Sequence, residues 1–289
     1  MSNENPITFA VEENIGIITL NLPKKLNAMT TSLYYRLGAL LREADTHPLT
    51  LVTLIIGTGR FFSAYVCLIQ LCRGHQLTSC RGADLQAGPE TADTPDEAGP
   101  RRAWLPALVT NTVDVPSAFF THSKVLICAL NGPVIGLSAA LVSHADFIYA
   151  VPHAYLLTPF GSLGLVSEGG ASTSFVRRMG LSLANEALLK GRKITATELK
   201  AVGFVNNLVS AKDENEFRVS VLGDIKATFG QHLVASSVLE TKRIMRRPIV
   251  REQETQALDE LFTGVNRFAA GIPQAEMMKI MTGEKKHKL

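Results

Sequence analysis

The chain has 289 residues, 46% of them hydrophobic and 19% charged, which predicts a globular protein of one large domain or two small ones. A formal net charge of +3 is too weak to argue for a nucleic-acid-binding protein, though it suits an anionic ligand. We expect no secretory signal and no membrane span, because neither MSNENPITFA nor any later apolar run has the required length.

The N-terminal part of the chain predicts alternating strands and helices. Two apolar runs around a polar break indicate a β-hairpin, formed by Ile7–Val11, Glu12–Asn14 and Ile15–Leu22. After the loop Lys24–Thr30, Thr30 or Thr31 can cap a helix that extends to about His47. This helix has an apolar face made of Leu33, Leu37, Leu40, Leu41 and Ala44. The β-branched run Leu51–Ile56 predicts a buried strand, and the alternation of elements indicates a layered α/β domain.

The next part of the chain is unusual in composition. It holds three of the four cysteines, Cys67, Cys72 and Cys80, so no disulfide framework is indicated and a reducing compartment is expected. His75 lies among them, but the spacing is not that of a zinc finger, and we expect no metal site. The following segment, Gln86–Pro106, contains four prolines and several acidic residues, which predicts a mobile surface segment.

The stretch Asn131–Leu141, NGPVIGLSAAL, is the centre of the predicted domain. It follows the apolar run Val125–Leu130 and opens the small-residue run Ser138–Ala145, so we expect a strand, a turn and a helix in that order. The first amide of such a helix has no partner inside the helix and lies at its electropositive end. It can bind a developing oxyanion, although a buried turn with a Gly-Pro corner fits the same pattern.

A single carboxylate, Glu168, lies in the apolar and glycine-rich run Val166–Gly170, with no basic residue nearby in sequence. A carboxylate in such a run is either a helix cap or first-turn charge, or a base kept away from water. Both interpretations stay open from this window alone.

The chain after Gly170 is mostly helical by its periodicity. The expected helices are Ser172–Met179, Ser182–Leu189, Thr195–Ala201, Asp213–Phe229, Leu233–Arg246 and Glu252–Ala270. We therefore divide the chain into an α/β core, residues 1–210, and a C-terminal helical region, residues 211–289.

Together these motifs resemble the crotonase (enoyl-CoA hydratase/isomerase) superfamily over nearly the whole chain, and they look most like its fungal peroxisomal Δ3,Δ2-enoyl-CoA isomerases. The resemblance is carried by Lys24–Thr30 (KKLNAMT), Gly59–Ala64 (GRFFSA), Gly82–Leu85 (GADL), Lys124–Ala150 and Phe160–Gly170 (FGSLGLVSEGG). It implies an α/β spiral of ββα turns, with C-terminal helices that cover the acyl site and pack in a homo-trimer or a dimer of trimers. A simple helical cap would fit the C-terminal sequence equally well.

The resemblance also implies a site that stabilises a thioester enolate. The backbone N–H groups of Ala83 and Leu137 would donate to the thioester oxygen, and Glu168 would move a proton from carbon 2 to carbon 4 of a 3-enoyl-CoA. The apolar neighbours of Glu168 should raise its pKa. Coenzyme A is then part of the substrate, and no separate cofactor is expected. The implied substrate-binding residues, several acting through backbone atoms, are Lys25, Asn27, Ala28, Asp84, Leu85, Gly136 and Phe160. A solvated surface lysine explains Lys25 equally well.

Two departures from the related hydratases favour isomerisation over hydration. Those enzymes place and activate water with two glutamates, and ungapped matching puts Ala140 and Phe160 at these positions. We therefore expect a Δ3,Δ2-enoyl-CoA isomerase of unsaturated fatty-acid β-oxidation. The alternatives are another crotonase reaction, such as hydration or a dienoyl-CoA isomerisation that typically needs an additional pocket carboxylate, and an inactive acyl-CoA-binding subunit.

Two further segments need separate comment: one interrupts the family pattern, and the other resembles a targeting signal. Tyr65–Arg81 separates GRFFSA from GADL, which should be contiguous. Removing the segment would keep the reading frame, and its ends can encode splice signals. Our hypothesis is therefore a retained intron, with a tolerated surface loop as the alternative. The last three residues, His287–Leu289, are similar to the Ser-Lys-Leu signal and predict a peroxisomal protein that binds an import receptor. The basic run Lys285–Leu289 could also be a solvated end or a nucleic-acid patch.

Overall fold

The larger of two β-sheets forms the body of the molecule. In this computed structural model, the described residues are 5–64 and 99–285. The sheet has six strands in the order β1-β2-β3-β4-β6-β9. Only β1 and β2 run antiparallel, while each later neighbour is parallel. The strand bounds are β1 Ile7–Glu12, β2 Ile15–Leu20, β3 Val52–Gly57, β4 Val125–Leu130, β6 Phe147–Ala150 and β9 Asn207–Leu208.

A smaller sheet of three strands accompanies the larger one. Its order is β5-β7-β8, formed by Val134–Ile135, Tyr155–Leu157 and Ile194–Thr195. The chain visits the two sheets in turn, first β4 then β5, and later β6 then β7, with a helix after each pair. Such repeated strand–strand–helix turns build a spiral, which is the α/β architecture that the family resemblance implies.

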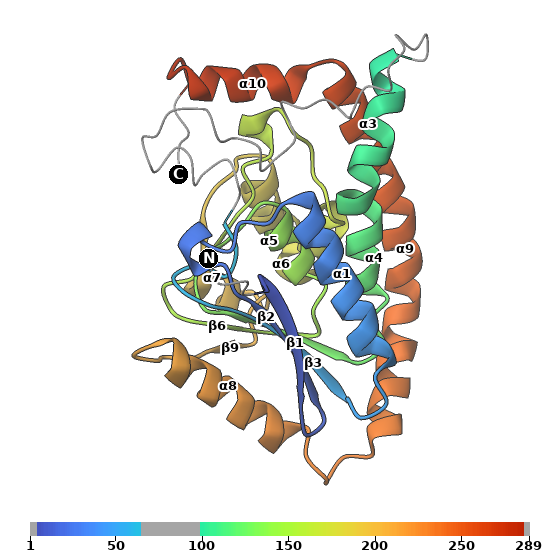
Figure 1. Cartoon of the computed structure of the whole chain (residues 1–289), viewed down its shortest axis with the longest axis vertical. Coiled ribbons are helices and arrows are strands. Elements are labelled where there is room, and N and C mark those ends of the chain that lie inside the picture. Colours follow the sequence, from blue (N-terminus) through green and yellow to red (C-terminus); the bar gives the residue numbers. More distant parts are fainter. Residues whose placement is uncertain (1–4, 65–98, 286–289) are drawn as a thin grey trace.

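The helices cover the sheets and extend the molecule on one side. Figure 1 shows α9 running along one side of the molecule, with α3 and α4 beside it, while α8 lies below the sheet and α10 lies at the opposite end. The helix bounds are α1 Thr31–Thr46, α3 Gly99–Val109, α4 Val115–Phe120, α5 Leu137–Val142, α6 Ala171–Leu188, α7 Ala196–Ala201, α8 Glu214–Thr228, α9 Ala235–Ala269 and α10 Ile272–Met281. Short helical turns are η1 Pro23–Lys25, η2 Thr110–Asp114 and η3 Gly161–Leu163.

Several elements form as the sequence predicts. The hairpin β1–β2 is confirmed, and Thr30 caps α1 by accepting a hydrogen bond from the Leu33 N–H at 3.3 Å. The predicted apolar face of α1 is buried or half-buried against the core, and β4 has the predicted bounds. Within α6, Gly180 has non-helical backbone angles, which separates the two helices expected there.

Three expectations about the helices were wrong. The break expected between Arg246 and Glu252 is absent, because α9 continues through Pro248. Pro248 is exposed, so water can bond the carbonyl that loses its N–H partner. The C-terminal end of the segment expected to be mobile is helical, with Pro106 inside α3. The helix α10 was not expected at all.

No helix in the described part of the chain is long and apolar enough to cross a membrane. Three segments with predictions of their own lie outside the described residues: Tyr65–Arg81, residues 86–98 and the tail His287–Leu289.

Candidate active site

The strand–turn–helix unit predicted at Asn131–Leu141 is present. Strand β5 enters α5 through Gly136, whose φ of 68° and ψ of −135° strongly favour glycine. The Gly136 N–H donates to the Leu157 carbonyl at 2.9 Å. The next N–H, that of Leu137, has no hydrogen-bond partner among residues 5–64 and 99–285. It is therefore available to a ligand at the start of α5.

The NGP corner before this turn holds the GRFFSA segment against it. The Asn131 amide donates to the Gly59 carbonyl at 2.7 Å, and the Ile135 N–H donates to the Ser63 carbonyl at 3.0 Å. A Cβ at Gly132 would lie only 2.1 Å from the Arg60 carbonyl oxygen, so only glycine allows this approach. The chain at Ala64 is consequently fixed beside the turn that precedes Leu137.

A tight bend carries Glu168 to the same place. Gly169 and Gly170 have φ values of 68° and 77°, in the left-handed region. A Cβ at Gly169 would lie 2.7 Å from Leu137 Cδ1 and 3.0 Å from Ala140 Cβ. The bend after Glu168 thus packs directly on the first turn of α5, the turn whose Leu137 N–H is the predicted oxyanion donor.

The bend is also held from behind by a neutral histidine. His144 donates from Nε2 to the Gly169 carbonyl at 2.7 Å. Burial lowers the pKa of His144 to about 4, so the imidazole stays neutral over the physiological range. This agrees with the structural role expected for a buried histidine.

Glu168 itself is half-buried and has no hydrogen-bond donor to its carboxylate among the described residues. It does not cap α6, whose N-cap is Gly170 and has no side-chain bond. Its carboxylate lines a cavity of about 20 Å³ together with apolar side chains of Leu108, Leu165 and Phe268. Burial, and then the charge of Glu260, raise the pKa of Glu168 to about 8. Of the two interpretations from sequence, these surroundings favour the base.

A chain of buried hydroxyl groups runs behind the site. Tyr34 Oη lies 2.9 Å from Ser138 Oγ, which donates to Ser63 Oγ at 2.8 Å, and that hydroxyl donates to the Asn27 carbonyl at 2.9 Å. Burial raises the pKa of the Tyr34 phenol, and the nearby Glu168 charge adds to this effect. Sequence reasoning did not identify Tyr34, whose position on the buried face of α1 was the available signal.

The residues predicted to bind substrate occupy different surroundings. Lys25 is exposed, while Ala28 and Phe160 are buried. The Asn27 side chain is occupied within the protein, because it accepts from the Leu22 N–H and donates to the Thr58 and Phe61 carbonyls at 2.8 Å each. Asn27 therefore braces two loops. The remaining predicted residues, Ala83, Asp84 and Leu85, lie outside the described residues.

Glu260 of α9 is a second residue near Glu168 that sequence reasoning missed. Its buried carboxylate accepts a hydrogen bond from the Gly170 N–H at 2.7 Å and lines the same cavity as Glu168. Among the described residues, no cluster of three or more histidine, cysteine or acidic side chains could hold a metal. The triad Cys72, His75 and Cys80 falls outside that part of the chain.

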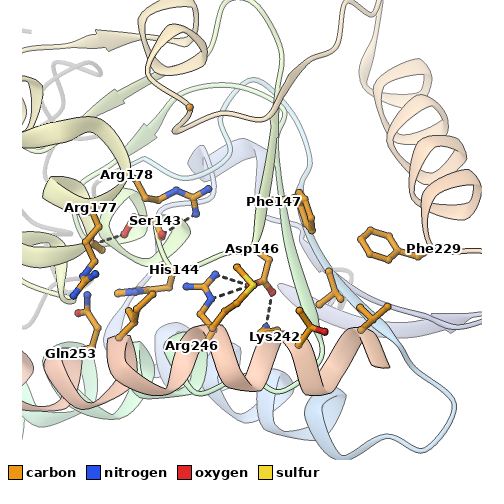
Figure 2. A pocket seen from close by; sticks show the side chains of 17 residues that line it. Ser143, His144, Asp146, Phe147, Arg177, Arg178, Phe229, Lys242, Arg246 and Gln253 are labelled. Carbon is orange, nitrogen blue, oxygen red and sulfur yellow. Dashed lines mark hydrogen bonds and ion pairs between the residues drawn. The ribbon is translucent and has the colours of Figure 1, made fainter. Parts of the chain in front are cut away.

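A larger cavity, about 630 Å³, lies between the core and the first half of α9 but does not include Glu168. Figure 2 shows Asp146 in it, between Arg246 and Lys242 of α9. Asp146 pairs with Lys242 at 2.5 Å and with Arg246 at 2.6 Å. Although burial opposes ionisation, these two cations lower the pKa of Asp146. The charges lining this cavity thus fasten α9 to the core, and the catalytic candidate remains at Glu168.

Comparison with known proteins gives consistent matches. The sequence profile of the enoyl-CoA hydratase/isomerase family matches residues 80–268. The chain is 45% identical to a Delta(3,5)-Delta(2,4)-dienoyl-CoA isomerase of Pyricularia oryzae, over 95% of this chain and 96% of that protein. It is 30% identical to the 3,2-trans-enoyl-CoA isomerase of Saccharomyces cerevisiae, over 98% of this chain and 96% of that protein.

The fold has close counterparts among solved structures. An enoyl-CoA hydratase from Bacillus halodurans superposes with a TM-score of 0.75 at 20% identity, over 95% of this chain and 99% of that chain. A hydratase/isomerase from Pseudoalteromonas atlantica gives the same TM-score at 21% identity, over 99% of this chain and 100% of that chain. The predicted crotonase-like α/β fold is thereby confirmed.

Proposed function

Because the chain belongs to the enoyl-CoA hydratase/isomerase family, we propose that it isomerises 3-enoyl-CoA to trans-2-enoyl-CoA in the β-oxidation of unsaturated fatty acids. Glu168 removes a proton from carbon 2 of the substrate, which leaves an enolate on the thioester oxygen. The N–H groups of Leu137 and Ala83 donate to that oxygen. Glu168 then returns the proton to carbon 4, and the double bond lies between carbons 2 and 3.

The observation that carries this proposal is the single carboxylate of Glu168, close to the first turn of α5 and without a hydrogen-bond donor in the described part of the chain. A base with a pKa near 8 matches a proton transfer at neutral pH better than an ordinary carboxylate does. Each N–H donor at the oxyanion contributes on the order of a hundredfold or more in rate.

Hydration is disfavoured by what surrounds this base. Ala140 lies against the Gly169 bend, so a hydratase glutamate at that position would be beside Glu168, and here there is only a methyl group. Phe160, at the second hydratase position, is a buried aromatic residue. Neither hydratase carboxylate is present, and the Glu260 carboxylate in the same cavity already accepts four hydrogen bonds, so the site lacks a free pair that could place and activate water.

A second candidate is the conversion of 3,5-dienoyl-CoA to 2,4-dienoyl-CoA, and the 45% identity to the Pyricularia oryzae relative favours it. That reaction moves a proton over a longer distance, which an additional carboxylate would help. Glu260 is near Glu168, but its oxygens already accept four hydrogen bonds. This occupancy favours the single-carboxylate reaction.

The deciding experiment is an ultraviolet assay of the purified protein with 3-hexenoyl-CoA and, separately, with 3,5-octadienoyl-CoA. We expect the first substrate to give the conjugated 2-enoyl product with the higher kcat/KM. A higher kcat/KM for the dienoyl substrate would select the second candidate. Absence of turnover with both would instead indicate an inactive acyl-CoA-binding subunit.

We also propose that the protein forms trimers, alone or in pairs. Large apolar side chains are exposed on α6, directly after it and on α9, among them Leu181, Leu189, Ile244 and Met245. Analytical ultracentrifugation tests this, because a monomer at micromolar concentration would contradict it.

We also propose that the protein is peroxisomal and that an import receptor binds its C-terminal tail. A fluorescent fusion ending in the native His287–Leu289 should enter peroxisomes, and removal of these residues should leave it in the cytosol. An unchanged distribution would mean that the tail is not the signal, or that import occurs on an intact partner subunit.

A further inference from the structure

Glu260 is a buried carboxylate whose presence needs an explanation. Only 5% of its surface is exposed, although glutamate is rarely buried without a partner. Its partners in the described part of the chain are N–H and O–H groups rather than cations. Burying a carboxyl group away from cations costs free energy of folding, which its hydrogen bonds must offset.

Those contacts lie on both sides of Glu168. Glu260 Oε2 accepts from the Gly170 N–H at 2.7 Å, while Oε1 accepts from the Ser172 N–H at 3.2 Å and the Ser172 hydroxyl at 2.6 Å. The Ser167 hydroxyl donates to Oε1 at 3.2 Å. The carboxylate thus connects residues on both sides of Glu168. It also accepts from N–H groups at the start of α6, where the N-cap Gly170 has no side chain that could do so.

The two carboxylates also share a space, since Glu168 and Glu260 both line the cavity of about 20 Å³. A negative charge that faces such a low-dielectric space disfavours ionisation of a neighbouring carboxyl group, here that of Glu168. The charge of Glu260 therefore acts on Glu168 independently of its hydrogen bonds.

We propose that Glu260 is a positioning residue for Glu168: from α9 it clamps the bend that carries the base, and its charge makes that base a better proton acceptor. This inference rests on the proposed role of Glu168. It makes the C-terminal helical region part of the catalytic apparatus of its own chain.

Three other titratable or charged groups surround Glu168 and must be considered in any pH profile. Tyr34 faces it from α1, and burial raises the pKa of that phenol far above the working range. His144 supports the bend and stays neutral because its pKa is about 4. Arg267 of α9 lines the same cavity but directs its Nε to the Gly164 carbonyl at 2.5 Å. Of the groups named, Glu260 is the one whose charge raises the pKa of Glu168.

The test is a carbon-13 NMR titration of glutamate-labelled protein, with the Glu168 signal identified by its loss in Glu168→Gln. In Glu260→Gln, which keeps the size of the side chain, we expect the pKa of Glu168 to fall by about one unit. The acid limb of kcat/KM should move to lower pH by the same amount. An unchanged titration in folded Glu260→Gln would overturn the role of the charge.

A matched variant separates the clamp from the charge. Ser167→Ala with Ser172→Ala removes two hydroxyl donors but leaves the carboxylate and its two backbone N–H donors. We expect kcat to fall about threefold to tenfold with the pH midpoint unchanged, because the base is held less firmly. Parental kcat in this variant would overturn the clamp, and this measurement stands even where Glu260→Gln fails to fold.

The titration also distinguishes this inference from the proposed function. A protein without isomerase activity, in which Glu260→Gln still lowers the pKa of Glu168, would refute the function and keep the coupling of the two residues. An active isomerase with no change in either readout would refute the positioning role alone.

Discussion

At the scale of single residues, the proposed reaction depends on the protonation of Glu168. Only the ionised carboxylate can accept the proton from carbon 2, and burial raises its pKa to about 8. At pH 6 about 1% of the enzyme would then hold the base in its ionised form. We expect kcat/KM to rise tenfold per pH unit from pH 6 to 7 and to level off above about pH 8. A flat profile between pH 6 and 9 would show that the base titrates elsewhere.

Gly170 gives a second residue-scale prediction, with Gly271 as a matched control. Their backbones are nearly the same, with φ and ψ of 77° and 11° at Gly170 and of 72° and 9° at Gly271. A Cβ at Gly170 would lie 2.4 Å from Gln253 Oε1 and 2.9 Å from Cε1 of the buried His144 ring, whereas one at Gly271 meets nothing within 4 Å. Gly271→Ala should therefore cost only about 1 kcal/mol of backbone strain. Gly170→Ala should cost at least about 2 kcal/mol and lower kcat about a hundredfold, since it displaces the bend.

Chemical denaturation and steady-state kinetics on both alanine variants provide the comparison. Equal losses of stability and activity in the two variants would contradict the tight packing described around Gly170.

The sequence revealed Glu168 and Leu137 because their signals are local: a carboxylate in a glycine-rich run and a turn that opens a helix. Glu260 has no such signal. It lies 90 positions from Gly170, on the long helix α9. Only tertiary packing brings it to the bend, so a single sequence could not identify it.

At the scale of elements, α9 was the least predictable part of the fold. Prolines usually end helices, and the sequence accordingly indicated two helices where there is one. Tertiary contacts override this preference, since α9 is fastened at Asp146 in its first half and buries Leu261, Val265 and Phe268 in its second. The strands β3 and β4 were predictable because each is a short, mostly apolar run that is buried throughout.

The continuity of α9 leads to a prediction for Pro248. The residue is exposed inside the helix and removes one intrahelical hydrogen bond, so Pro248→Ala should raise the free energy of unfolding by about 1–3 kcal/mol. Thermal unfolding followed by circular dichroism measures the change. A lower melting temperature would indicate that the helix is broken at this point in solution.

At the scale of the whole molecule, the segment Tyr65–Arg81 matters most. Its neighbour Ala64 is held in place, because Ser63 bridges to Val134 and the Ala64 N–H donates to the Leu26 carbonyl at 2.9 Å. In a chain that runs from Ala64 directly to Gly82, Ala83 would follow closely after this fixed point. We expect deletion of Tyr65–Arg81 to raise kcat/KM about a hundredfold, because the second oxyanion donor is then held near Leu137.

Two measurements evaluate this segment. Equal activity of the full and deleted chains would identify a harmless surface loop. Transcript sequencing addresses its origin separately, since messages that uniformly retain the segment would rule out a retained intron.

The central claim, that Glu168 is the base, is tested most directly by Glu168→Gln. The change removes the proton acceptor but keeps the size of the side chain. It also leaves the Leu137 N–H and the predicted coenzyme A-binding loops unchanged. We predict that isomerisation of 3-hexenoyl-CoA falls by at least about a thousandfold, while calorimetry shows acyl-CoA binding within a few-fold of the parent. Turnover within a few-fold of the parent would contradict the account.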